Sequence, residues 1–323
     1  MRRKLIHSTA RILCALAVII SVAAGCISQP SLRRNQLSAL VVDDLRLNDH
    51  VVMLSQTCHP RDWTHVANLE RCANYIATHF ATAGAVVESQ PFDVQDQTYR
   101  NVIGRYGVGR GDKIVVGAHY DACGDTPGAD DNASGVAALI ELAYLLQRNA
   151  PDREVELVAY TLEEPPFFRT PHMGSAVHAQ RLADEEAELK GVIVLEMVGC
   201  FSDKKGSQSY PSLLLKLMYP SRGNFIAVAG PWHQGDWIKS VKIGMKGATD
   251  LPVYSIRAPS AVPGIDFSDH LNYWPHGFKA IMITDTAFYR NRAYHTPADR
   301  ADSLDYKRMA KVVIALHKAL HTL

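Results

Sequence analysis

The 323-residue sequence lacks an excess of either charge, with 34 Lys+Arg against 33 Asp+Glu. This balance argues against nucleic-acid binding, which needs a clustered basic excess. The chain also has only six cysteines, none in a Cys-x-x-Cys pair. A dense disulfide framework and a thiolate metal site are therefore not supported. Without an internal repeat or a low-complexity tract, the sequence is that of an ordinary globular protein.

The exception to the even charge is the N-terminus, where residues 2–11 carry four basic residues and no acid. Residues 12–24 are apolar apart from Ser21, a run shorter than the about 20 residues that span a bilayer. This pattern predicts a signal peptide over residues 1–25. Its removal leaves a mildly acidic body of net charge −3.

The end of this segment, Val22-Ala23-Ala24-Gly25-Cys26, resembles a bacterial lipobox, which implies cleavage before Cys26 and a lipid on its sulfur. Simple secretion, with Cys26 incidental, is the alternative. We expect an exported protein of the periplasm or cell envelope, anchored to the membrane. In such an oxidising compartment Cys58 and Cys72 could pair, although spacing alone does not set connectivity.

The rest of the chain alternates apolar, β-branched runs with stretches of helical periodicity. Strands are predicted near residues 86–87, 101–103, 114–116, 155–160, 192–195, 225–228, 253–256 and 280–283. Helices are predicted over 69–83, 134–148, 172–183, 236–244 and 303–320. This order predicts an α/β fold with a mostly parallel mixed sheet of about eight strands and helices on both faces. Residues 26–65 are predicted to be a lipidated tether and partly helical lead-in, followed by one domain over 66–323.

Polar residues follow several of these strands, at the sheet edge where α/β proteins place their sites. They are His119 and Asp121, Asp131, the pair Glu163 and Glu164, Glu196, and His295. Each alone has an ordinary explanation, such as a structural histidine, a solvated turn or a helix N-cap. Together, so many carboxylates would raise one another's pKa unless a cation were bound. Nitrogen and oxygen donors without thiolate fit catalytic zinc, and a bridging carboxylate would allow two ions about 3.5–4 Å apart.

The ordered motifs over residues 69–320 resemble the zinc-dependent aminopeptidases typified by secreted bacterial leucyl aminopeptidases, with glutaminyl cyclases as the nearest look-alikes. The motifs are Gly117-Ala118-His119-Tyr120-Asp121, Gly128-Ala129-Asp130-Asp131-Asn132-Ala133-Ser134-Gly135, Glu163-Glu164 with Met173-Gly174-Ser175, Glu196-Met197, and Tyr294-His295-Thr296. The resemblance implies a zinc-exopeptidase, phosphorylase/hydrolase-like fold. It also implies that the domain over residues 66–323 is catalytic.

Residue by residue, the resemblance implies that Asp131 bridges two zinc ions. His119 and Glu196 would complete one site, Glu164 and His295 the other, and Glu163 would be the general base. The Asp131–Asn132 peptide is expected to be cis.

Four further residues are expected to support this site. Asp121 would orient the imidazole of His119. Tyr294 would donate to the oxyanion, the alternative being a packed tyrosine. Asp269 and His270 would line the pocket and support the ligands, the alternative being a helix N-cap.

The leading functional hypothesis is a two-zinc aminopeptidase that acts on peptides. A one-zinc glutaminyl cyclase and a carboxypeptidase on the same scaffold are the alternatives. A non-catalytic binding module would need a lost ligand or base, and none is lost. Two departures limit the transfer of substrate preference: Glu196 stands where several relatives have Asp, and Pro165-Pro166-Phe167-Phe168 replaces a Gly-rich stretch.

Overall fold

The structure, a computed structural model, describes residues 21–323. It forms one eight-stranded sheet in the order β1-β2-β4-β3-β5-β8-β6-β7. The strands are β1 (Val86–Val94), β2 (Gln97–Tyr106), β3 (Lys113–His119), β4 (Val155–Tyr160), β5 (Leu189–Glu196), β6 (Ile226–Pro231), β7 (Val253–Ala258) and β8 (Ala280–Thr284). Strands β4, β3, β5 and β8 are parallel, whereas β1–β2, β2–β4 and β6–β8 pair antiparallel. The predicted mostly parallel mixed sheet is confirmed.

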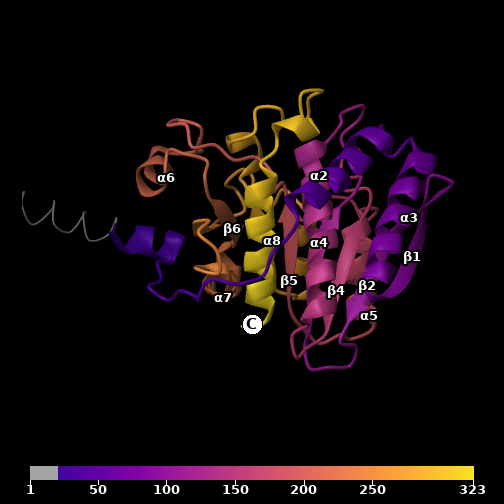
Figure 1. The fold of residues 1–323 in the computed structure, drawn as a ribbon, viewed down its shortest axis with the longest axis horizontal. Coiled ribbons are helices and arrows are strands. Elements are labelled where there is room, and N and C mark those ends of the chain that lie inside the picture. Colours follow the sequence, from indigo (N-terminus) through magenta and orange to yellow (C-terminus); the bar gives the residue numbers. More distant parts are fainter. Residues whose placement is uncertain (1–20) are drawn as a thin grey trace, which may run out of the picture.

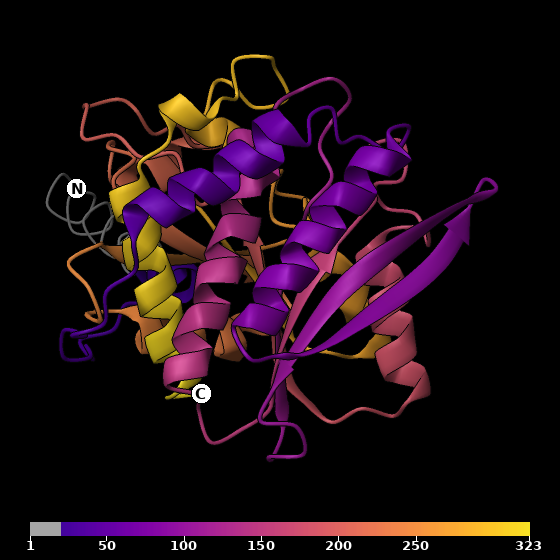
Figure 2. The same cartoon turned by 45° about the vertical axis from the view of Figure 1, so that its right-hand side comes forward.

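Helices cover both faces of the sheet (Figure 1). One face carries α2 (Asp44–Val52), α3 (Val66–Thr82), α4 (Gly135–Arg148), α7 (Gly235–Met245) and α8 (Tyr306–Leu320). The opposite face carries α5 (Gly174–Asp184) and the 3-10 helix η4 (Asp269–His276). Figure 2 shows α3 lying along the β1–β2 hairpin. The short helix α6 (Leu213–Met218) precedes β6, and no helix among residues 21–323 is long and apolar enough to cross a membrane.

The central strands are apolar because both of their faces are buried. All six residues of β4 are buried, including Glu156. The carboxylate of Glu156 is paired with His178 at 2.8 Å, Arg105 at 2.7 Å and Lys113 at 3.1 Å, which satisfies a charge that would otherwise be costly to bury. Helix α4 is buried nearly all round, as expected for a helix between a sheet and other helices.

The segment predicted as tether and lead-in, residues 26–65, packs against the body over much of its length. Leu47, Val51 and Leu54 are fully buried in the main core, so this part of the lead-in folds together with the residues that follow. Cys58 and Cys72 also lie in this core as free cysteines, and their pairing stays a prediction. Cys26 is exposed, and most of the predicted signal peptide lies outside the described residues.

Candidate active site

Most of the predicted polar residues lie at the carboxyl ends of β3, β4 and β5, which share one edge of the sheet. His119 is the last residue of β3 and Glu196 the last of β5, while Glu163 and Glu164 follow β4. Asp131 lies in the turn η2 (Ala129–Ser134), directly before α4. His295 comes from the loop after β8 and also reaches Asp131. The topology therefore brings together residues that are up to 176 positions apart.

These side chains form two groups that share Asp131. In the first, Nε2 of His119 lies 3.4 Å from Oδ1 of Asp131 and 3.4 Å from Oε2 of Glu196. In the second, Nε2 of His295 lies 3.1 Å from Oδ2 of Asp131 and 3.3 Å from Oε2 of Glu164. The two oxygens of one carboxylate thus face two separate histidines, which is the arrangement that a bridging ligand requires.

The chemistry of this donor set fits a metal. Both ring nitrogens of His119 and Oε1 of Glu164 are buried without a hydrogen-bond partner among the described residues. Without a cation, burial and the neighbouring Asp131 raise the pKa of Glu164 to about 7. Burial raises the pKa of Glu163 well above its usual range as well. A bound cation would supply the missing partners and remove the repulsion between carboxylates.

Glu163 differs from the other acids of the cluster. Its nearest histidine nitrogen, Nε2 of His119, lies 3.9 Å away, and neither of the two groups of potential ligands includes it. Its backbone position is nevertheless held tightly, because Asp121 accepts hydrogen bonds from the N–H groups of Glu163, at 3.2 Å, and Glu164, at 3.0 Å. Asp121 also lies 3.5 Å from Nδ1 of His119, the atom it was predicted to orient. Asp121 therefore contacts both the predicted base and a predicted ligand.

Replacing Asp121 by Asn is expected to lower activity about 10–100-fold, the usual cost of losing a supporting carboxylate. The amide retains one acceptor oxygen for two N–H donors, so the turn that carries Glu163 and Glu164 loses a hydrogen bond. Steady-state kinetics together with zinc analysis measures the effect. The matched control is Asp152→Asn, at an exposed acid in the loop before β4. It should leave both the activity and the zinc content unchanged. Full activity in the Asp121 variant would show that the turn does not need this support.

The turn that carries Asp131 is held by Asn132 and by Asp299, which the sequence motifs did not indicate. The Asp131–Asn132 peptide is cis, as expected. Asp299 accepts hydrogen bonds from the backbone N–H groups of Asp130 and Asp131, and Nδ2 of Asn132 donates to the carbonyl of Leu195 at 2.8 Å. Ser268 donates to Oε2 of Glu196 at 2.7 Å and so orients this predicted ligand.

Three further predicted residues, Tyr294, Asp269 and His270, belong to neither group of potential ligands. The ring of Tyr294 stacks on that of His295, with centroids 3.8 Å apart. Asp269 is buried with both carboxylate oxygens lacking a hydrogen-bond partner among the described residues. His270 contacts the carbonyl of Ile265 through Nε2, at 2.8 Å, and packs edge-on against Trp274. His270 thus supports the loop before η4 through that backbone contact.

One cysteine lies beside the second group of side chains. None was expected to have a metal role, yet the thiol of Cys123 lies with Glu164 and His295 in a group whose potential ligand atoms are all within 4.8 Å of one another. No Cys-x-x-Cys pattern marks this residue, because its partners come from distant parts of the chain. A thiol is therefore within reach of the second predicted metal position.

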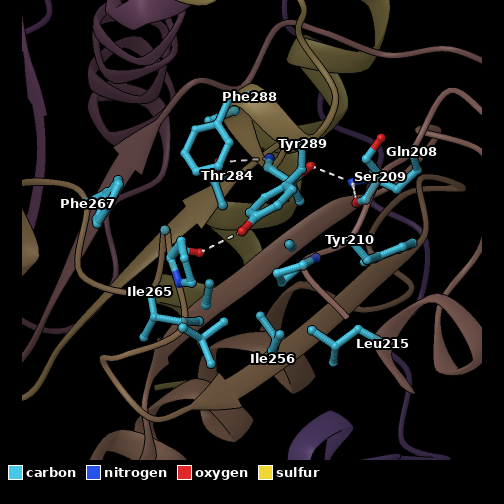
Figure 3. A pocket seen from close by; sticks show the side chains of 18 of the residues that line it. Gln208, Ser209, Tyr210, Leu215, Ile256, Ile265, Phe267, Thr284, Phe288 and Tyr289 are labelled. Carbon is cyan, nitrogen blue, oxygen red and sulfur yellow. Dashed lines mark hydrogen bonds between the residues drawn. The ribbon is translucent and has the colours of Figure 1, made fainter. Parts of the chain in front are cut away.

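An apolar pocket opens beside Glu196 and Tyr294 (Figure 3). Tyr210 and Leu215 line it from the segment around α6, Ile256 from β7, and Phe267 and Phe288 from the loops around η4 and β8. Glu196 is the one charged side chain among the residues that line it. A pocket of this kind suits a large apolar group held next to the polar cluster.

The chain is similar in sequence to known peptidases. Residues 101–320 match the model of "Peptidase family M28". The chain is 49% identical over 276 residues to the Escherichia coli K12 protein YfbL, covering 83% of this chain and 84% of YfbL. It is 32% identical over 123 residues to aminopeptidase YwaD of Bacillus subtilis, covering 37% of this chain and 26% of YwaD.

Solved structures share the fold. The zinc aminopeptidase BSAP of Bacillus subtilis superposes with a TM-score of 0.68 at 15% identity, covering 86% of this chain and 94% of BSAP. The glutaminyl cyclase of Bacteroides thetaiotaomicron superposes with a TM-score of 0.68 at 20% identity, covering 90% of this chain and 99% of the cyclase. The family match confirms the resemblance to zinc metallopeptidases that the motifs indicated, and the chain belongs to peptidase family M28.

Proposed function

We propose that the protein is a two-zinc aminopeptidase that removes N-terminal residues from peptides. The observation that carries the proposal is the position of Asp131, whose two oxygens face His119 and His295 in separate groups. Glu196 adds a carboxylate to the first group and Glu164 to the second, so each would offer three protein donors. Relatives named as aminopeptidases and as a zinc aminopeptidase support this assignment.

Zinc ions held by these residues would polarise the peptide carbonyl and lower the pKa of the attacking water. Glu163 accepts the proton of that water, because it is close to the ligand cluster and belongs to neither group of ligands. It then returns the proton to the nitrogen of the leaving peptide. The Asp121 contacts described above hold its backbone in place for both transfers.

The apolar pocket is placed to receive the side chain of the N-terminal residue. Glu196, one of the predicted metal ligands, is among the residues that line it. Aromatic and aliphatic side chains line it, which favours large apolar side chains such as those of leucine and phenylalanine over glycine. The carboxylates around His119 are negatively charged, so they would attract the positively charged α-amino group at the substrate's N-terminus.

The second candidate is a one-zinc glutaminyl cyclase, favoured by the fold shared with the Bacteroides thetaiotaomicron enzyme. The two candidates differ in metal content and in the bond they act on. A carboxypeptidase on this scaffold differs in requiring a free C-terminus rather than a free N-terminus. We further propose export to the periplasm or cell envelope, with Cys26 carrying a membrane anchor.

A panel of dipeptides with free and blocked ends, combined with zinc analysis, tests the proposal. We expect about two zinc ions per chain, cleavage only where the N-terminus is free, and faster cleavage after leucine or phenylalanine than after glycine. Cyclisation of N-terminal glutamine by a protein with one zinc ion would favour the cyclase. Cleavage of N-blocked peptides with a free C-terminus would favour a carboxypeptidase.

A further inference from the structure

Helix α6 presents three leucines to solvent. Leu213 is 71% exposed, Leu214 39% and Leu217 78%. Leu213 and Leu217 are four residues apart and so lie on one side of the helix. Leu215 points the other way, because it is buried and lines the apolar pocket. The helix is thus apolar on both its inner and outer sides, and only the inner side is covered.

The sequence around α6 is basic. Residues 204–235 contain Lys204, Lys205, Lys216 and Arg222 and no acid. Residues 21–42 contain Arg33 and Arg34 and no acid. Asp203 and Asp236 directly flank the first segment, and Asp43 and Asp44 follow the second. Between these acids, the six basic residues of the two segments make a local excess of positive charge. Such an excess attracts an anionic surface.

These two segments meet in space. Ser28 and Ser31 line the same hollow as Met218, the last residue of α6. Nζ of Lys242 on α7 donates to the carbonyl of Ser28 at 2.8 Å, and Oγ of Ser255 on β7 donates to it at 2.9 Å. The chain directly after Cys26 is therefore held against the body beside α6. Figure 1 shows α6 and the N-terminal segment at the same end of the molecule.

We propose that Leu32, Leu213, Leu214 and Leu217, with the basic residues around them, form a surface that docks on an anionic phospholipid bilayer. Leu32 is completely exposed and lies in the segment that lines the hollow. Leucines that enter the interface and cations that contact headgroups are the usual components of such a surface. A second copy of the chain fits less well, because two positive surfaces would face each other. The proposal extends the proposed membrane anchor and does not depend on the peptidase reaction.

Brominated lipids test the proposal, because they quench tryptophan only where it enters the bilayer. The purified full chain carries either Leu217→Trp or the control Val86→Trp and is mixed with vesicles of brominated phosphatidylcholine and phosphatidylglycerol. Val86 is 62% exposed and lies on β1, at the opposite edge of the sheet from β7. The wild-type chain corrects for the four native tryptophans.

We expect the added emission of Leu217→Trp to fall at least about twofold, as for a side chain in the bilayer interface, and that of Val86→Trp to stay unchanged. Equal emission from both variants with and without lipid would overturn the proposal. So would a dimer in lipid-free solution that dissociates on Leu213→Gln with Leu217→Gln, since the leucines would then contact a second copy. Peptidase activity of each variant, measured without lipid, verifies folding. Leu213→Trp serves as a second probe if Leu217→Trp does not fold.

Discussion

Replacing Glu163 by Gln is expected to lower kcat by about 10²–10⁴-fold, because the amide cannot accept the proton of the attacking water. The zinc content should stay unchanged, since Glu163 belongs neither to the group of His119 and Glu196 nor to that of Glu164 and His295. Kinetics with an amino-acyl anilide and zinc analysis of the same preparation measure both values. An unchanged KM would show that the loss lies in the chemical step rather than in substrate binding.

The matched control is Glu188→Gln. Glu188 is exposed in the loop before β5, so the same loss of charge there should alter neither kcat nor zinc content. Two results would contradict the assigned role of Glu163. Retained activity would show that another group is the base, and a loss of zinc would show that Glu163 is a ligand.

Replacing Asp131 by Ala is expected to remove both zinc ions and with them all measurable activity. Its two oxygens face the two groups separately, so both groups lose a ligand at once. Glu196→Ala, by contrast, should lower the zinc content from about two to about one, because Glu196 contacts only the group of His119. Zinc analysis after dialysis measures the difference between the two variants.

The loss of zinc should also lower stability. At a free zinc concentration 100 times the dissociation constant, each site stabilises the folded chain by about 2.7 kcal/mol. We therefore expect the thermal unfolding temperature of wild-type protein to fall on chelation and to recover with added zinc, whereas Asp131→Ala should not respond. Asp152→Ala, at an exposed acid, is the control and should behave like wild type. A wild-type protein that binds one zinc ion would contradict the bridging role.

Several elements could be predicted from the sequence because burial imposes a pattern on it. Strand β4 is apolar over nearly its whole length because both of its faces are covered. Strand β1 was predicted only at residues 86–87 but extends to Val94. Its exposed residues include Ser89, Pro91 and Asp93, which carry little strand signal because this edge strand faces solvent.

The N-terminal lead-in shows the opposite case. Leu47 and Val51 lie on α2, and Leu54 follows in the π-helical turn Met53–Thr57, yet these residues were assigned to a partly helical lead-in outside the predicted domain. Only the packed structure shows that this helix contributes to the main core. Helix α6 was missed because six residues are too short to show a period.

For the site, the sequence by itself determined which polar residues follow the central strands. Because these strands are parallel, their carboxyl ends bring those residues to one edge of the sheet. The tertiary structure decided how they are grouped: that Asp131 faces two histidines, that Asp299 and Asp121 hold the turns, and that Cys123 lies beside the second group. The physical reason is that these contacts join backbone groups and side chains far apart in the chain. Such contacts leave no spacing or periodicity in the sequence, whereas burial of a strand or helix face does.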